Sequence, residues 1–248
     1  MFRCIAAAIF APVLTAQNHV ELEGRYWIPQ LSSHLRLERN GLGTDIDAQK
    51  DLGIRDTNLP SGTVAWQHRW SRLSFSYTPL SFSGDQNVSR TVVFNGQQYT
   101  VGTRIQSDLS IQHLQLNWTY ELIHSKDGKF RLSPLVEADA FLMHGRLSAP
   151  VLSPPISESE DLSVGLPAAG LRMLLSPLRR LDIFAQVAGM DVPGYGYFVG
   201  SDSGARVRLF QQLFLSAGYR TFNLHVENSP DFFRVQLRGP FVGAGLQF

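Results

Sequence analysis

The feature that most limits how this chain can fold is an alternation of apolar and polar residues that recurs along almost its whole length. The clearest example is the segment 114–122, "LQLNWTYEL", in which every second residue is apolar. Successive side chains of a β-strand point to opposite faces, so this pattern predicts a strand with one apolar and one polar face.

The same alternation recurs in about ten segments, each near the length that a tilted strand needs to cross a lipid bilayer. The expected strands lie around residues 20–28, 63–70, 73–78, 114–122, 130–140, 171–175, 181–187, 206–209, 213–220 and 233–248. The sequence therefore predicts an all-β fold, a closed antiparallel up-and-down transmembrane β-barrel of about ten strands, with eight or twelve also compatible.

Short and long connections alternate between these segments. The expected turns lie at 70–72, 125–128, 176–180 and 210–212, and the expected loops at 32–58, 84–106, 149–161, 193–204 and 227–231. Tight turns at one end and long polar loops at the other are typical of outer-membrane barrels, whose short turns face the periplasm. An even number of strands would place both ends of the barrel domain on the periplasmic side.

A soluble β-sandwich or lipocalin-like barrel also alternates, so the position of the charged residues is informative. The chain has three lysines, Lys50, Lys126 and Lys129, and all fall in expected loops or turns. The charges within strands are mostly arginines and carboxylates, which can pair on an inner wall away from bulk water. The residues expected to line the lumen are Arg25, Arg69, Glu121, Arg131, Glu137, Asp139, Arg172, Asp182, Arg206, Arg208, Arg220, Arg234 and Arg238. The alternative is a solvated face of a soluble protein.

Aromatic residues gather toward the short-turn ends of the expected strands. Such residues form girdles at the edges of membrane barrels, with an apolar ring and a polar tip. Those expected in the girdle are Trp66, Trp70, Tyr77, Trp118, Tyr120 and Phe130. The alternative is that they are ordinary core aromatics.

Charge and hydropathy exclude other classes of protein. The formal net charge is +1, so there is no general electrostatic argument for nucleic-acid binding. After the N-terminal segment, no run of 18 apolar residues occurs, and transmembrane helices are therefore not expected.

The first residues have the pattern of a secretory signal. Arg3 is followed by the apolar run 4–14 and then by Thr15 and Ala16. We expect a signal peptide over 1–16 and a barrel domain over 17–248. The alternative is a buried N-terminal segment of a cytosolic protein.

The chain ends on "GPFVGAGLQF", in which Val242, Ala244, Leu246 and Phe248 share one face. This ending resembles the closing-strand signal of Gram-negative outer-membrane β-barrels. The resemblance implies recognition by the barrel-assembly machinery, a location in the outer membrane and contact with its lipids. The apolar phase changes near Gly239 and Pro240, which predicts a β-bulge there. The segments 24–29, "GRYWIP", and 44–54, "TDIDAQKDLGI", also resemble the opening of a group of uncharacterised barrels.

No cofactor, metal site or catalytic residue is predicted. One alternative is a rim hydrolase acting on lipid or peptide, in which His144 with Glu137 and Asp139 approaches His113 with Asp108 and Ser110. The spacing of Asp45, Asp47 and Asp51 is similar to that of a calcium loop, but the glycine and the closing glutamate are missing, so a solvated acidic loop is expected. The proline-rich segment 148–161 is expected to be a stiff surface loop.

The leading functional hypothesis is a non-enzymatic barrel with a structural or adhesive role, because about ten strands enclose little more than their own lumen side chains. Nine expected strand arginines outnumber six acids, counting Glu21 and Glu23 with the four acids above. That excess suggests the alternative of a narrow pore for small anionic or amphipathic solutes. No ligand can be identified from these patterns.

Overall fold

A computed structural model describes residues 18–36, 44–55, 59–94, 97–150 and 156–248. The expected signal peptide lies outside the described residues. The strands are β1 (Asn18–Trp27), β2 (Gln30–Arg36), β3 (Ile46–Asp47), β4 (Leu59–His68), β5 (Ser71–Asn87), β6 (Val92–Phe94), β7 (Gln97–Tyr99), β8 (Arg104–Tyr120), β9 (Ile123–His124), β10 (Phe130–Ala149), β11 (Ile156–Leu178), β12 (Leu181–Val192), β13 (Gly196–Arg208), β14 (Leu213–Asn228) and β15 (Asp231–Gln247); α1 spans Ala48–Leu52.

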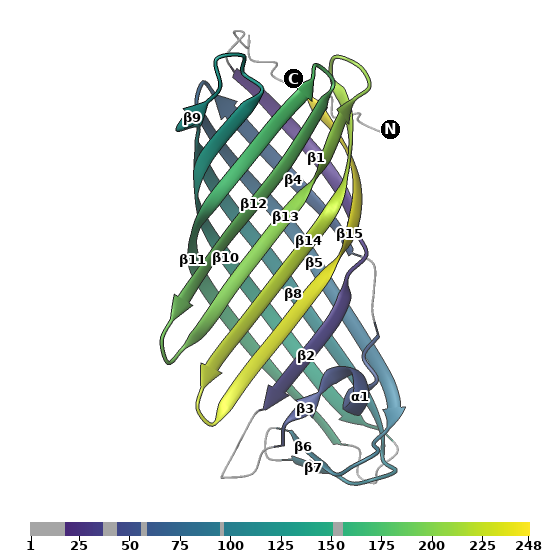
Figure 1. Cartoon of the computed structure of the whole chain (residues 1–248). Coiled ribbons are helices and arrows are strands. Elements are labelled where there is room, and N and C mark those ends of the chain that lie inside the picture. Colours follow the sequence, from purple (N-terminus) through teal and green to yellow (C-terminus); the bar gives the residue numbers. More distant parts are fainter. Residues whose placement is uncertain (1–17, 37–43, 56–58, 95–96, 151–155) are drawn as a thin grey trace, which may run out of the picture.

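Ten of the described strands form a closed antiparallel barrel (Figure 1). Their order is β1-β4-β5-β8-β10-β11-β12-β13-β14-β15, and β15 pairs back onto β1. The last residue takes part in the closure, because Phe248 and Val20 exchange backbone hydrogen bonds of 2.9 and 3.0 Å. The prediction of an all-β barrel of about ten strands is confirmed, and the pairing of β15 with β1 leaves no free edge at this seam.

Both ends of the barrel domain lie at the end that carries the short connections, at the top of Figure 1. The turns there join β4 to β5, β11 to β12 and β13 to β14, and a longer connection containing β9 joins β8 to β10. The opposite end carries α1, β3 and the small β6–β7 hairpin. Among the described residues, no helix has the length and apolar character needed to cross a lipid bilayer.

Near the short-turn end, the barrel is apolar outside and polar inside. The outer surface exposes Leu22, Val64, Phe75, Leu116 and Val136, whereas Glu21, Glu23, Asn117, Glu137 and Asp202 are buried in the interior. The expected girdle residues Trp66, Trp70, Trp118, Tyr77 and Tyr120 are also exposed on this part of the chain. A soluble protein has the reverse distribution, so this arrangement fits a surface solvated by lipid.

Farther from the short turns, the inward face of the barrel becomes apolar and the outward face becomes polar. On β5, the inward positions change from Arg72, Ser74 and Ser76 to Leu80 and Phe82. The outward positions of β5 change from Leu73, Phe75 and Tyr77 to Ser81, Ser83 and Asp85. The same change occurs on β14 between Arg220 and Phe222, and on β15 between Arg238 and Pro240. We call the part with the apolar outer face the membrane zone and the part with the polar outer face the outer zone.

The outer zone is built like a soluble β-domain, with an apolar core inside the barrel. The core includes Trp27, Leu31, Leu59, Leu80, Phe82, Ile105, Ile111, Phe141, Met143, Leu147, Phe198, Phe222, Leu224, Val235 and Leu237. Ile46 of β3 and Ala48 and Leu52 of α1 pack against this core. Asp47 caps α1 by accepting from the backbone N–H groups of Gln49 and Lys50, and Gly53 ends it with a φ of 66°.

The predicted β-bulge at Gly239 and Pro240 is wrong. The register of β15 with β14 runs without a shift from Leu213↔Leu246 to Asn228↔Asp231. The strand keeps its alternation, and the apolar phase changes because β15 passes from one zone to the other. Gly239 is needed for a different reason, since a Cβ there would lie 2.0 Å from the carbonyl oxygen of Ile28, where β1 leads into β2.

Several predicted loops are largely strand, including 227–231, where only Ser229 and Pro230 lie outside β14 and β15. Residues 193–204 were expected to form a loop, but β13 begins at Gly196 and the turn covers only Pro193–Tyr195. Gly200, Ser201 and Ser203 are small, so they give no apolar alternation although they lie within the sheet. The segment 148–161 likewise contains the end of β10 and the start of β11.

Candidate functional site

The lumen of the membrane zone is filled by a network of ion pairs centred on two glutamates of β1. Glu23 accepts hydrogen bonds from Arg25 Nε at 2.9 Å, Arg206 Nη2 at 3.3 Å and Ser216 Oγ at 2.6 Å. Glu21 accepts from Arg72 Nη2 at 2.8 Å and from Arg206 Nη1 at 3.0 Å. The two carboxylates share the fork of Arg206, and the network therefore ties β1 to β5, β13 and β14 across the barrel.

The network continues toward the outer zone through Arg25. This guanidinium donates to Asp202 Oδ2 at 2.5 Å, and it lies over the ring of Phe241 with its central carbon 4.5 Å from the ring centroid. Removing one member of such a buried set leaves its partner charged and unpaired, which is strongly destabilising. The lumen polar groups thus hold the wall together from inside.

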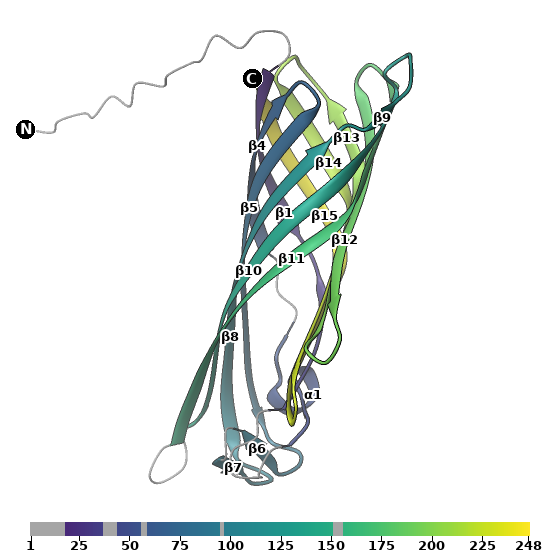
Figure 2. The same ribbon diagram turned by 90° about the vertical axis from the view of Figure 1, so that its left-hand side faces the viewer.

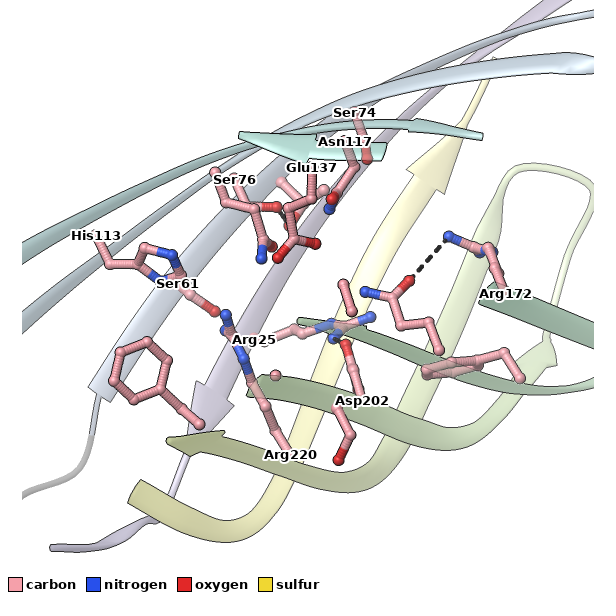
Figure 3. Close-up of a pocket in the computed structure, with 18 of the residues that line it drawn as sticks. Arg25, Ser61, Ser74, Ser76, His113, Asn117, Glu137, Arg172, Asp202 and Arg220 are labelled. Atoms are coloured by element: carbon pink, nitrogen blue, oxygen red, sulfur yellow. Dashed lines mark hydrogen bonds and ion pairs between the residues drawn. The ribbon is translucent and has the colours of Figure 1, made fainter. Parts of the chain in front are cut away.

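Two small cavities remain within this packing. The first is about 60 Å³ and lies among Arg25, Glu137, Arg172, Asp202 and Arg220, where Arg172 Nη1 donates to Gln186 Oε1 at 3.4 Å (Figure 3). The second is about 100 Å³ and lies nearer the short-turn end. Both cavities are lined by Arg72, Arg172, Phe184 and Arg206, so these side chains stand between them. Each cavity has room for a few water molecules.

The interior holds equal numbers of basic and acidic side chains among the described residues. The seven arginines are Arg25, Arg72, Arg131, Arg172, Arg206, Arg208 and Arg220, and the seven acids are Glu21, Glu23, Glu121, Glu137, Asp139, Asp182 and Asp202. At the short-turn end, Arg208 Nη2 donates to Asp182 Oδ2 at 2.7 Å and Arg131 Nη1 to Glu121 Oε1 at 3.2 Å. The interior is therefore balanced rather than positive.

Three residues expected on the lumen wall lie elsewhere. Arg69 is in the exposed turn between β4 and β5, and Arg234 and Arg238 are exposed on the outer face of β15 in the outer zone. Arg234 and Arg238 were assigned to the lumen because they are the polar residues of an alternating strand, and in the outer zone the polar face is the outer one. Among the charged lumen residues, sequence reasoning missed two. Arg72 shares its face with Ser74 and was read as part of a turn, and Asp202 fell within an expected loop.

An imidazole–carboxylate pair lies at the border of the two zones. His113 Nε2 and Asp139 Oδ1 are 2.6 Å apart, and Asp139 also accepts from Gln115 Nε2 at 3.3 Å. The His113 side chain is 3% exposed and stacks on Phe141, with ring centroids 4.4 Å apart. It is thus held inside the barrel, away from the rim.

The His144–His113 arrangement of the alternative rim hydrolase does not form in the described residues. His144 lies on the outer side of β10 and its Nδ1 is 2.7 Å from Asp161 Oδ1, whereas His113 points into the lumen. Asp108 is exposed on the outer face of β8. No serine hydroxyl is hydrogen-bonded to His113 or His144 in the described part of the chain.

A layer of aromatic rings closes the lumen directly beyond His113. Phe141 lies 5.3 Å from Phe222 and 5.9 Å from Phe198, measured between ring centroids, and Phe198 and Phe222 are 5.6 Å apart. All three rings are buried, and the apolar core of the outer zone continues beyond them, away from the short turns. In the described residues, buried apolar side chains thus fill the barrel interior from this layer toward the end bearing the long loops.

The acidic segment 45–51 is more ordered than a solvated loop. The carboxylate of Asp51 is buried and receives Arg90 Nε at 2.9 Å and Arg90 Nη2 at 2.5 Å, together with the backbone N–H of Asp47 at 2.8 Å. The hydrogen bonds from Arg90 hold the pKa of Asp51 below its usual range. These acids cap α1 and fasten it to the loop that follows β5.

The comparisons with known proteins identify the fold. No protein-family model matches the sequence, and no curated protein matches it. Among solved structures, the chain is similar to the outer membrane protease OmpT from Escherichia coli, with a TM-score of 0.54 and 7% identity over 94% of this chain and 98% of that one. It also matches the translocator domain of the autotransporter NalP from Neisseria meningitidis, with a TM-score of 0.45 and 10% identity over 95% of this chain and 90% of that one. The chain has the fold of Gram-negative outer-membrane β-barrels.

Proposed function

We propose that this protein is a non-enzymatic outer-membrane barrel whose lumen is sealed and whose outer zone serves a structural or adhesive role at the cell surface. The observation that carries the proposal is the pairing of a charge-balanced, side-chain-filled lumen with the aromatic layer of Phe141, Phe198 and Phe222. A transport pore needs a continuous aqueous path, and two cavities of about 60 and 100 Å³ do not supply one.

The outer zone supports the adhesive part of the proposal. It extends the sheet beyond the membrane zone, carries polar outer faces and has its own apolar core. A rigid domain raised above the lipid is suited to presenting a binding surface. The similarity to OmpT concerns the fold alone, and the imidazole of His113 is buried beneath the aromatic layer with no serine bonded to it among the described residues.

Planar-bilayer recording tests the sealed lumen. The protein without residues 1–16 would be refolded in detergent, checked for the folded state by heat-modifiable gel mobility, and added to a planar lipid bilayer. We expect no steady conductance from folded, inserted protein. A steady anion-selective conductance would overturn the proposal and make the narrow pore the correct function, with Arg172 and Arg206 as the first residues to replace.

A further inference from the structure

The wall of the barrel is incomplete in the outer zone on one side of β11. β11 pairs with β12 only from Leu178↔Leu181 to Ala169↔Gly189, whereas its pairing with β10 continues to Ala149↔Ile156. β12 and β13 turn back early, at Pro193–Tyr195. Figure 2 shows the β10–β11 hairpin leaning away from β12 and β13 at this end. Within the described chain, residues 156–168 therefore form a strand with a free hydrogen-bonding edge.

An apolar groove of about 270 Å³ opens beside this edge. Leu162 of β11 lines one side, Phe232 and Phe233 of β15 line the other, and Leu109 and Met143 form part of its base. Leu162 is 39% exposed. The lining residue Met143 belongs to the outer-zone core and Phe233 packs against it, so the groove gives access to that core. The neighbouring outward residues His144 and Arg146 are polar, so the groove lies in the outer zone and not on the lipid-facing surface.

The charged residues that line the groove are all acidic. They are Glu160, Asp161 and Asp231, and no lysine, arginine or histidine is among the described lining residues. The carboxylate of Asp161 also contacts the His144 ring, and Glu160 lies on the groove face of β11, two residues before Leu162. An occupant with apolar groups for the groove and positive charge for its rim is therefore complementary to this surface.

We propose that the β11 edge binds an extended segment of another protein in which apolar and basic residues alternate, so that the segment adds a strand to the sheet. Main-chain hydrogen bonds to residues 156–168 would supply affinity, and its apolar side chains would enter the groove. The inference rests on the proposed role of the outer zone as a binding surface. A second copy of this chain is disfavoured, because pairing two β11 edges would bring Glu158, Glu160 and Asp161 of each copy together.

The experiment measures binding of fluorescein-labelled synthetic peptides of about ten residues to the detergent-folded protein by fluorescence polarisation. The probes are alternating Lys-Val, alternating Glu-Val, and two Lys-Val peptides that carry N-methyl groups on either the valine or the lysine amides. In a strand, the backbone N–H groups that point to one edge belong to every second residue. Edge pairing therefore predicts that one methylated peptide loses about tenfold or more in affinity and the other keeps it. The Glu-Val peptide should bind at least about tenfold more weakly than Lys-Val.

Variants of the chain locate the site. Asp161→Lys changes the charge on the face of β11 that would meet the lysines of the peptide, and it should weaken Lys-Val binding about tenfold. Leu162→Ser changes the groove face, and it should weaken binding severalfold. Asp127→Lys makes the same change of charge in an exposed turn at the other end of the barrel, so it is the matched control and should change affinity less than about twofold.

Three results would overturn the inference: equal binding of both methylated peptides and the parent peptide, equal binding of Glu-Val, or a dimer by analytical ultracentrifugation that excludes the peptide. Conductance is recorded independently. A sealed barrel that binds no peptide would remove this inference and leave the sealed lumen in place.

Discussion

At the scale of single residues, Asp51 illustrates how a carboxylate organises the outer end of the barrel. Its buried side chain joins α1 to Arg90 in the connection after β5. The folded-state pKa of Asp51 is lowered, chiefly by the hydrogen bonds from Arg90, so the ion pair stabilises the folded state fully above the unfolded pKa of about 4. That contribution is lost as the pH falls through the lower, folded-state pKa.

We therefore expect α1 and the segment 88–94 to exchange backbone amide hydrogens faster on acidification below about pH 4, while the barrel strands stay protected. Hydrogen exchange measured by mass spectrometry, corrected for the intrinsic rate at each pH, would show this. Asp51→Asn should exchange fast at neutral pH and lose the pH dependence. Asp45→Asn, at a side chain that is 67% exposed, should behave like the parent protein; the same pH response in Asp51→Asn would contradict the assignment.

At the scale of elements, the aromatic layer fastens β10, β13 and β14 to one another across the lumen. Phe222 is buried against Phe141, Phe198 and His113. Truncating such a ring removes its packing and leaves a cavity, at a cost of about 3–5 kcal/mol. Leu224, Val235 and Leu237, which lie farther from the short turns, would still fill the lumen.

Phe222→Ala should thus lower the free energy of unfolding by about 3–5 kcal/mol without creating a conductance. A guanidinium titration followed by gel mobility would measure the change. Phe210→Ala, in a turn and 73% exposed, is the matched control and should leave the midpoint within error. A variant that folds with parental stability would show that the ring layer is not packed as described.

At the scale of the whole molecule, the positions of the four tryptophans can be used to locate the barrel relative to the lipid bilayer. Trp66, Trp70 and Trp118 are exposed on the outer surface near the short turns, and Trp27 is buried inside the barrel, where its Nε1 donates to the carbonyl of Gly239 at 3.1 Å. Girdle residues sit at the level of the lipid headgroups.

Single-tryptophan variants in vesicles of brominated lipids should separate these positions. We expect Trp66 and Trp118 to be quenched most by bromine close to the headgroup and less by bromine near the chain end, and Trp27 to be quenched by neither. Strong quenching of Trp27 would show that this side chain faces the lipid and not the interior of the barrel.

The sequence predicted the architecture well and the outer zone poorly, for a physical reason. Alternation reports which residues share a face, and in the membrane zone a single assumption, apolar outside, places Leu116, Val136 and Glu137 as the structure does. In the outer zone the alternation continues with the opposite meaning. For that reason Arg234 and Arg238 were placed in the lumen and a bulge was expected at Gly239. The pairing of Glu23 with Arg206, from opposite ends of the chain, depends on strand tilt and register, which no local pattern contains.

The inversion between the two zones has a consequence for how the protein reaches its final position. If the short turns face the periplasm, as is usual in outer-membrane barrels, the outer zone must cross the bilayer during insertion. Its strands carry Asp85, Arg104, Arg146 and Arg238 on their outward face. Moving such side chains through hydrocarbon is costly, and the cost rises with bilayer thickness. Insertion into a membrane without assistance should therefore be slow for this chain, and far slower in thick bilayers than in thin ones.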